Sequence, residues 1–188
     1  MKFSRGFTLI EVLVVIVVIA LLVSISALNS DSDPRADILK TEATRIKFYL
    51  ESATDEAILN SKTLALNFIE KKISPYSWGK KPQSTDNESQ DPISQKDEWE
   101  WTAYKGQNLI QFQSSNDTEY QLFINDKEVI LDFEEPQEKA IIPQVIIQSS
   151  GIQTLAEIKL SLPDYESSIS IKSNGAGRFK IGEPNNEI

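Results

Sequence analysis

The chain has 188 residues, a formal net charge of −9 and neither cysteine nor histidine. The excess of negative charge disfavours binding to the phosphate backbone of nucleic acids. Without histidine, imidazole-dependent catalytic triads and histidine-ligated zinc or haem are excluded, and without cysteine an exported domain must be held together by packing alone. We therefore expect no cofactor, no metal and no nucleic-acid partner.

The N-terminal segment combines a basic start with a long apolar run. Lys2 and Arg5 precede the run, and from residue 7 to residue 28 it would extend roughly 33 Å as an α-helix, about the thickness of the hydrocarbon core of a bilayer. Acidic residues follow it, so the positive-inside rule leaves the N-terminus in the cytoplasm. The sequence predicts a single-pass membrane helix over residues 7–28, with the rest of the chain exported.

Glu11 is the one ionisable residue within this run. A charge there costs on the order of 3 kcal/mol, and an intramembrane carboxylate is read as functional, with a partner to be named. If the chain is cut between Gly6 and Phe7, the new α-amine at the head of the helix becomes a candidate partner. That amine could belong to the same helix or to a neighbouring one.

The sequence Gly6-Phe7-Thr8-Leu9-Ile10-Glu11, with Arg5 before it and an apolar helix after it, resembles the leader and N-terminal helix of type IV pilins and type II secretion pseudopilins. The resemblance implies that a prepilin peptidase cuts after Gly6 and that Phe7 is then methylated. It also implies that Glu11 pairs with the terminal amine of the subunit ahead of it during filament assembly. An ordinary secretory signal or a plain signal anchor are the alternatives, and neither has a use for the carboxylate.

A second helix is predicted from about residue 37 to residue 60, after the capping pair Asp33-Pro34. Its apolar residues follow spacings of three and four and form one stripe, which needs a sheet to cover it. The stripe consists of Leu39, Ala43, Ile46, Leu50, Ala53 and Ala57.

Short alternating runs predict an antiparallel sheet domain with two packed layers, so the fold class is α+β. The runs are Leu64-Leu66-Phe68, Ile110-Phe112, Tyr120-Leu122-Ile124, Val129-Leu131-Phe133, Val145-Ile147, Ile158-Leu160, Ile169-Ile171 and Phe179-Ile181. Hairpins are expected at Asn125-Asp126 and at Asn174-Gly175. The polar stretch at residues 79–98 is predicted to be a long loop, and the tail after residue 182 is expected to be frayed.

The order of the predicted elements narrows the resemblance to one group within this family. The passage from Thr41 to Phe68 and the segment from Val145 to Gly151 are similar to those of the H-type minor pseudopilins of type II secretion. The cysteine pair usual in type IV pilins and the calcium loop of the major pseudopilin are both missing. Four parts are implied: a leader at 1–6, a membrane and filament-core helix at 7–28, the periplasmic half of the helix at 29–62 and a periplasmic β domain at 63–188.

The function implied by the resemblance is that of a structural subunit near the tip of a periplasmic pseudopilus, which helps to export folded proteins across the outer membrane. Its partners would be the major and the other minor pseudopilins, the prepilin peptidase, the inner-membrane secretion platform, inner-membrane lipid and exoprotein cargo. Two alternatives stay open: a minor pilin of a type IV pilus, and a membrane-anchored periplasmic enzyme, for which we find no catalytic constellation.

Two other groups of residues are candidate sites. Trp78, Trp99 and Trp101 are interpreted as core or half-buried structural residues, with an aromatic surface for an exoprotein or a sugar as the alternative. The acidic pairs, such as Asp97-Glu98 and Glu134-Glu135, are interpreted as solvated charge, because the spaced ligands of a calcium loop are absent.

Overall fold

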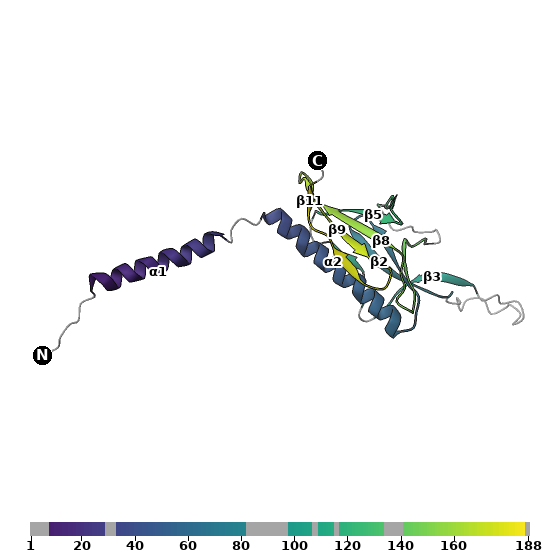
Figure 1. Ribbon diagram of the computed structural model, residues 1–188. Coiled ribbons are helices and arrows are strands. Elements are labelled where there is room, and N and C mark those ends of the chain that lie inside the picture. The colour runs from purple at the N-terminus through teal and green to yellow at the C-terminus, as the bar shows by residue number, and fades with distance from the viewer. Residues whose placement is uncertain are drawn as a thin grey trace, which may run out of the picture. The chain divides into compact units, whose positions relative to one another are not determined.

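The computed structural model describes residues 8–28, 33–81, 98–106, 109–114, 117–133 and 141–186. The chain divides into two compact units, residues 1–37 and residues 38–188, and each is described by itself (Figure 1). The leader predicted at 1–6 and the cleavage site at Gly6 and Phe7 lie outside the described residues.

The first unit contains the helix α1, Leu9–Leu28. From Leu9 to Val23 every residue except Glu11 is apolar. Within the part of the chain that is described, no helix satisfies both the length and the hydropathy expected of a membrane span. Phe7 and the side chains of residues 24–28, which belong to the predicted span, are not part of that description.

The helix α2, Pro34–Leu59, begins and packs as the sequence predicts. The backbone N–H of Arg35 donates to Oδ1 of Asp33 at 2.9 Å, so Asp33 caps the helix with proline in the first helical position. All six residues of the predicted apolar stripe are 0% exposed. The prediction of this helix and of its buried face is confirmed.

One antiparallel sheet, sheet A, is built around the strand that follows α2. Its strand order is β3-β2-β1-β7, and β4 pairs with β2 off this path. The strands are β1 (Leu64–Ile69), β2 (Lys72–Lys80), β3 (Trp99–Ala103), β4 (Phe112–Gln113) and β7 (Val145–Ile147).

A second antiparallel sheet, sheet B, has the order β10-β9-β8-β5-β6, and β11 pairs with β9. Its strands are β5 (Glu119–Ile124), β6 (Lys127–Val129), β8 (Ala156–Ser161), β9 (Ser167–Ser173), β10 (Phe179–Ile181) and β11 (Asn185–Asn186). Asn125 and Asp126 join β5 to β6 with φ angles of 50° and 63°, as a two-residue type I′ hairpin requires.

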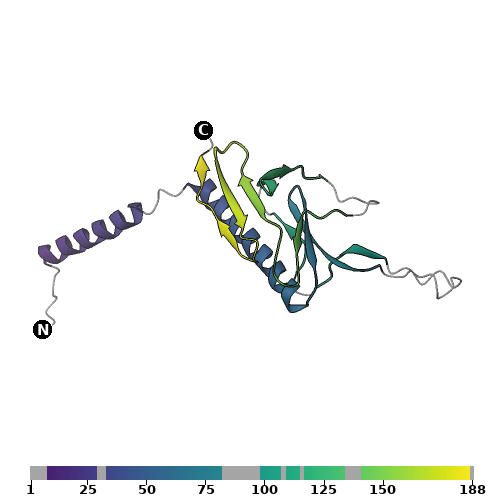
Figure 2. The same cartoon turned by 45° about the vertical axis from the view of Figure 1, so that its right-hand side comes forward.

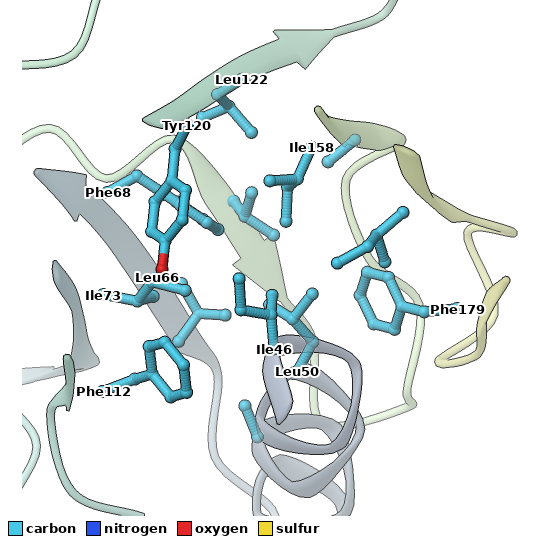
Figure 3. Close-up of a cluster of buried hydrophobic side chains, with 14 of the residues drawn as sticks. Ile46, Leu50, Leu66, Phe68, Ile73, Phe112, Tyr120, Leu122, Ile158 and Phe179 are labelled. Atoms are coloured by element: carbon cyan, nitrogen blue, oxygen red, sulfur yellow. The ribbon is translucent and has the colours of Figure 1, made fainter. Parts of the chain in front are cut away.

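Both sheets contribute side chains to the same core that buries the stripe of α2. Figure 3 shows Ile46 and Leu50 of α2 among Leu66 of sheet A and Ile158 and Phe179 of sheet B. In Figure 2 the helix runs alongside strands of both sheets. The α+β class is therefore confirmed, while the packing of the two sheets as layers stays a prediction.

A buried carboxylate links α2 to sheet B by a hydrogen bond. Glu42 is 0% exposed and accepts hydrogen bonds from the hydroxyl of Tyr120 at 3.2 Å and from Nη1 of Arg45 at 2.7 Å. A buried charge without partners is costly, so these two donors offset the cost of burying the Glu42 carboxylate beside the apolar stripe. Burial, together with the charge of Glu42, raises the pKa of the Tyr120 phenol, so this hydroxyl stays a donor at neutral pH.

The structure corrects five expectations about the strands and the segments beside them. Strand β2 was not predicted, because Pro75 and the serines beside it break the alternation of apolar residues. This strand extends to Lys80, and the N–H of Lys81 donates to the carbonyl of Glu98 at 2.9 Å, so the polar loop is shorter than 79–98; residues 82–97 lie outside the description.

The other corrections concern strand ends. Ile110 lies outside β4, and β6 ends at Val129, so Leu131 and Phe133 are not strand residues. The tail is not wholly frayed either, since Asn185 and Asn186 pair with Ser168 and Ser167 of β9.

We predict that Leu50→Ala lowers the free energy of unfolding by about 2–5 kcal/mol, because it opens a cavity where α2 meets both sheets. The measurement is urea unfolding of the full-length chain in detergent. Phe48→Ala is the matched control: Phe48 lies on the same helix but is 63% exposed, and its truncation should change stability by about 0.5 kcal/mol or less. Equal losses in the two variants would contradict the assignment of the buried face.

Stability should fall at alkaline pH. Burial and the hydrogen bond that its hydroxyl donates to Glu56 at 2.6 Å raise the pKa of Tyr104 to about 12. An unfolded tyrosine loses its proton near pH 10, so the stabilisation is complete below pH 10 and is lost as pH rises towards 12. We expect Tyr104→Phe to make this fall shallower in urea titrations repeated at each pH, whereas Phe48→Ala should leave its slope unchanged.

Candidate functional site

The candidate site is the beginning of α1, where Thr8 caps the helix. The carbonyl of Thr8 accepts the N–H of Glu11 at 3.1 Å and the N–H of Val12 at 3.3 Å. Its hydroxyl oxygen also accepts the N–H of Glu11, at 3.4 Å. A threonine followed three residues later by a glutamate has the spacing of a capping box, so the local sequence fixes where the helix starts.

Glu11 is therefore the third residue of α1. A carboxylate in the first turn interacts favourably with the positive end of the helix dipole, which offsets part of the cost of placing an acid in apolar surroundings. Among the described residues, no lysine or arginine forms an ion pair with it. Its predicted partner, the amine of Phe7, falls in the undescribed N-terminal stretch, so the pairing stays a prediction.

The rest of α1 offers apolar surface on every side. All described side chains from Leu9 to Val23 are exposed within this single chain. One strip, formed by Leu9, Val12, Leu13, Ile16 and Val17, follows the spacing of neighbours along one helix face. A helix that is apolar all round needs a cover of other apolar groups, such as neighbouring helices.

The other sequence candidates are acidic residues, a glycine-rich segment and three tryptophans. In the described ranges, no group of three or more acidic residues could hold a metal ion. Asp97, Glu134 and Glu135 lie outside those ranges. The glycine-rich segment after β9 is structural, because a Cβ on Gly177 would lie 2.7 Å from Cγ2 of Thr54 in α2. This glycine lets the β9–β10 turn approach the helix.

The three tryptophans come together on one face of the β2–β3 hairpin. Trp78 lies across from Trp101 in the register of the two strands, and its ring is 5.1 Å from that of Trp101 and 6.4 Å from that of Trp99. Trp78 is 43% exposed and Trp99 is 51% exposed, so the interpretation of the tryptophans as core or half-buried residues is wrong for these two, while Trp101 is partly buried. That all three meet could not be foreseen without strand β2.

Three comparisons with known proteins address the identity of the chain. Residues 1–27 match the family model described as the prokaryotic N-terminal methylation motif. Over 66 residues the chain is 38% identical to type II secretion system protein H of Pseudomonas aeruginosa. That alignment covers 35% of this chain and 38% of the relative, so the match spans less than half of the relative's length.

The fold agrees with that of two solved structures. The chain superposes on the crystal structure of the minor pseudopilin EpsH from the type II secretion system of Vibrio cholerae with a TM-score of 0.55 at 13% identity, covering 81% of this chain and 98% of that one. The solution structure of GspH from E. coli gives a TM-score of 0.54 at 16% identity and covers 82% and 94% of the two chains.

The start of α1 at Thr8 and Glu11 lies within the residues that match the N-terminal methylation motif. Over 66 residues the sequence is similar to that of type II secretion system protein H, and over most of its length the chain shares the fold of EpsH and GspH. The resemblance predicted from the sequence is confirmed. The matched proteins are named for secretion, not for a catalytic activity.

Proposed function

We propose that the chain is an H-type minor pseudopilin of a type II secretion system, a structural subunit near the tip of the periplasmic pseudopilus and not an enzyme. The observation that carries this proposal is the single carboxylate, Glu11, in the first turn of an otherwise apolar helix inside the matched methylation motif. The similarity to protein H and the shared fold support the assignment to secretion.

The first step of the proposed maturation is proteolysis. A prepilin peptidase cuts between Gly6 and Phe7, and the new amine of Phe7 is methylated. Thr8 then becomes the second residue of the mature chain and caps α1, which places the amine and the Glu11 carboxylate at the same end of the helix. The cut turns an uncharged peptide link into a cation close to the membrane acid.

The second step is storage in the inner membrane, with the β domain in the periplasm. In lipid, the carboxylate of Glu11 costs on the order of 3 kcal/mol. Pairing with the terminal amine of another subunit would remove much of that cost, because opposite charges attract strongly in surroundings of low dielectric constant. The acid therefore favours contact with a neighbouring helix start and fixes the register of α1 beside it.

The third step is mechanical. The helix α1 leaves the lipid and enters the filament core, where neighbouring helices replace acyl chains around a surface that is apolar on every side. Because Glu11 needs an amine supplied by a subunit ahead of it, we place this chain beneath another tip subunit. Its direct partners would be other minor pseudopilins, the major pseudopilin and the inner-membrane platform, and cargo contact would be made by the β domain.

We predict that Glu11→Val leaves membrane insertion intact but lowers incorporation into the pseudopilus and the secretion of exoproteins about tenfold or more, in line with the loss of an ion pair worth more than 1.4 kcal/mol. Membrane fractionation, filament shearing and exoprotein assays in a complemented deletion strain provide the measurements. Glu11→Asp, which keeps the charge, should retain more secretion than the valine variant.

Wild-type secretion by Glu11→Val would contradict the pairing. A deletion strain that secretes normally but loses twitching motility or DNA uptake would instead favour a minor pilin of a type IV pilus. Turnover of a substrate by the purified chain would favour the membrane-anchored enzyme.

A further inference from the structure

Strand β3 is the outer strand of sheet A, and among the described residues its one ladder partner is β2. Figures 1 and 2 both show it extending away from the body of the domain. The N–H of Tyr104 donates to the carbonyl of Pro75, and that of Lys81 donates to the carbonyl of Glu98, each at 2.9 Å. In an antiparallel ladder the intervening residues of the outer strand direct their N–H and C=O groups to the other side.

The outward-directed residues of β3 are therefore Trp99, Trp101 and Ala103. Their N–H and C=O groups form an open edge, which is a template for a further strand unless charge, proline or a cover protects it. Of the five residues of β3, none is proline or lysine and one, Glu100, is charged.

The two faces of this edge differ in chemistry. One face carries Trp99, which is stacked on Trp78, and Trp101, which is tilted against Trp78; none of the three belongs to the hydrophobic core. Successive strand residues point to opposite faces, so Glu98 and Glu100 lie on the other face. Neither carboxylate forms an ion pair with a residue that the structure describes.

We propose that the edge of β3 binds an extended segment of a partner protein as an added strand, with apolar side chains over the tryptophans and basic side chains over Glu98 and Glu100. The backbone groups of the edge supply the hydrogen bonds, and the alternation of the two faces supplies the selectivity. This inference concerns the β domain and does not depend on the proposed role of Glu11.

Two other occupants fit less well. The chain's own residues 82–97 contain two prolines and Ile93 as their one large apolar residue, so they lack the apolar positions needed to cover the tryptophans. A second copy would bring a second acidic edge to the first, in a chain whose net charge is −9. Charge complementarity therefore favours a basic and apolar segment from a different protein.

The test uses full-length protein in a zwitterionic detergent and a short synthetic peptide that alternates valine and arginine. The three tryptophans of the chain are all in this cluster, so intrinsic fluorescence reports on the proposed site. We expect saturable binding. The affinity should fall about tenfold or more, equivalent to about 1.4 kcal/mol, when alternate backbone nitrogens of the same peptide are methylated.

Ala103→Pro removes an outward N–H without removing a hydrogen bond to β2, and Ala103→Val is its matched control. The proline variant should bind the peptide about tenfold more weakly than the valine variant. Glu98→Gln combined with Glu100→Gln should also weaken binding. The same change of charge on sheet B, Glu119→Gln combined with Glu128→Gln, should leave peptide binding unchanged.

Each of the following results would overturn the proposal: no fluorescence change, equal affinity for the methylated peptide, or equal affinity of the proline and valine variants. Stronger peptide binding after deletion of residues 82–97 would identify that segment as the occupant. Self-association that Ala103→Pro abolishes would identify a second copy instead.

Discussion

An acid in the first turn of an apolar helix is the constraint on which the account of this chain depends. Glu11 has a favourable local position, since it follows the Thr8 cap and faces the positive end of the helix dipole. In the proposed membrane-bound state that advantage is smaller than the cost of keeping a charge in lipid, so we propose that the acid pairs with a cation. A terminal amine created by cleavage at Gly6 would supply one where the chain itself has none, because the next basic residue after Arg5 is Arg35.

The domain formed by α2 and the two sheets must be stable without disulfides. It achieves this by burying one helix face against two sheets, with Ile46 and Leu50 at the centre. The few polar groups in this interior are paired: Tyr120 and Arg45 donate to Glu42, and no buried side-chain polar atom that the structure describes lacks a partner. A compact domain of this kind can be carried by α1 without depending on the redox state of its compartment.

Local patterns predicted the parts of the structure that short-range physics determines. The stripe of α2 follows from helical periodicity, and the Asn125-Asp126 hairpin follows from the turn chemistry of two residues that tolerate positive φ. Strand β2 was missed because Pro75 interrupts its alternation. The contact between Glu42 and Tyr120, which are 78 residues apart, has no local signal at all. The cluster of three tryptophans has no local signal either. Trp78 lies beside the other two only because β2 pairs with β3, and the sequence does not reveal that pairing.

The central claim is that a neighbour's amine neutralises Glu11 in the assembled filament. Zero-length carbodiimide coupling of sheared pseudopili, followed by mass spectrometry, tests it most directly, because an amide forms where a carboxyl group and an amine are in contact. The account predicts a peptide in which Glu11 is joined to the N-terminal amine of another subunit, and a mature chain that begins at Phe7. A chain that still begins at Met1, or coupling at surface lysines with none at Glu11, would contradict it.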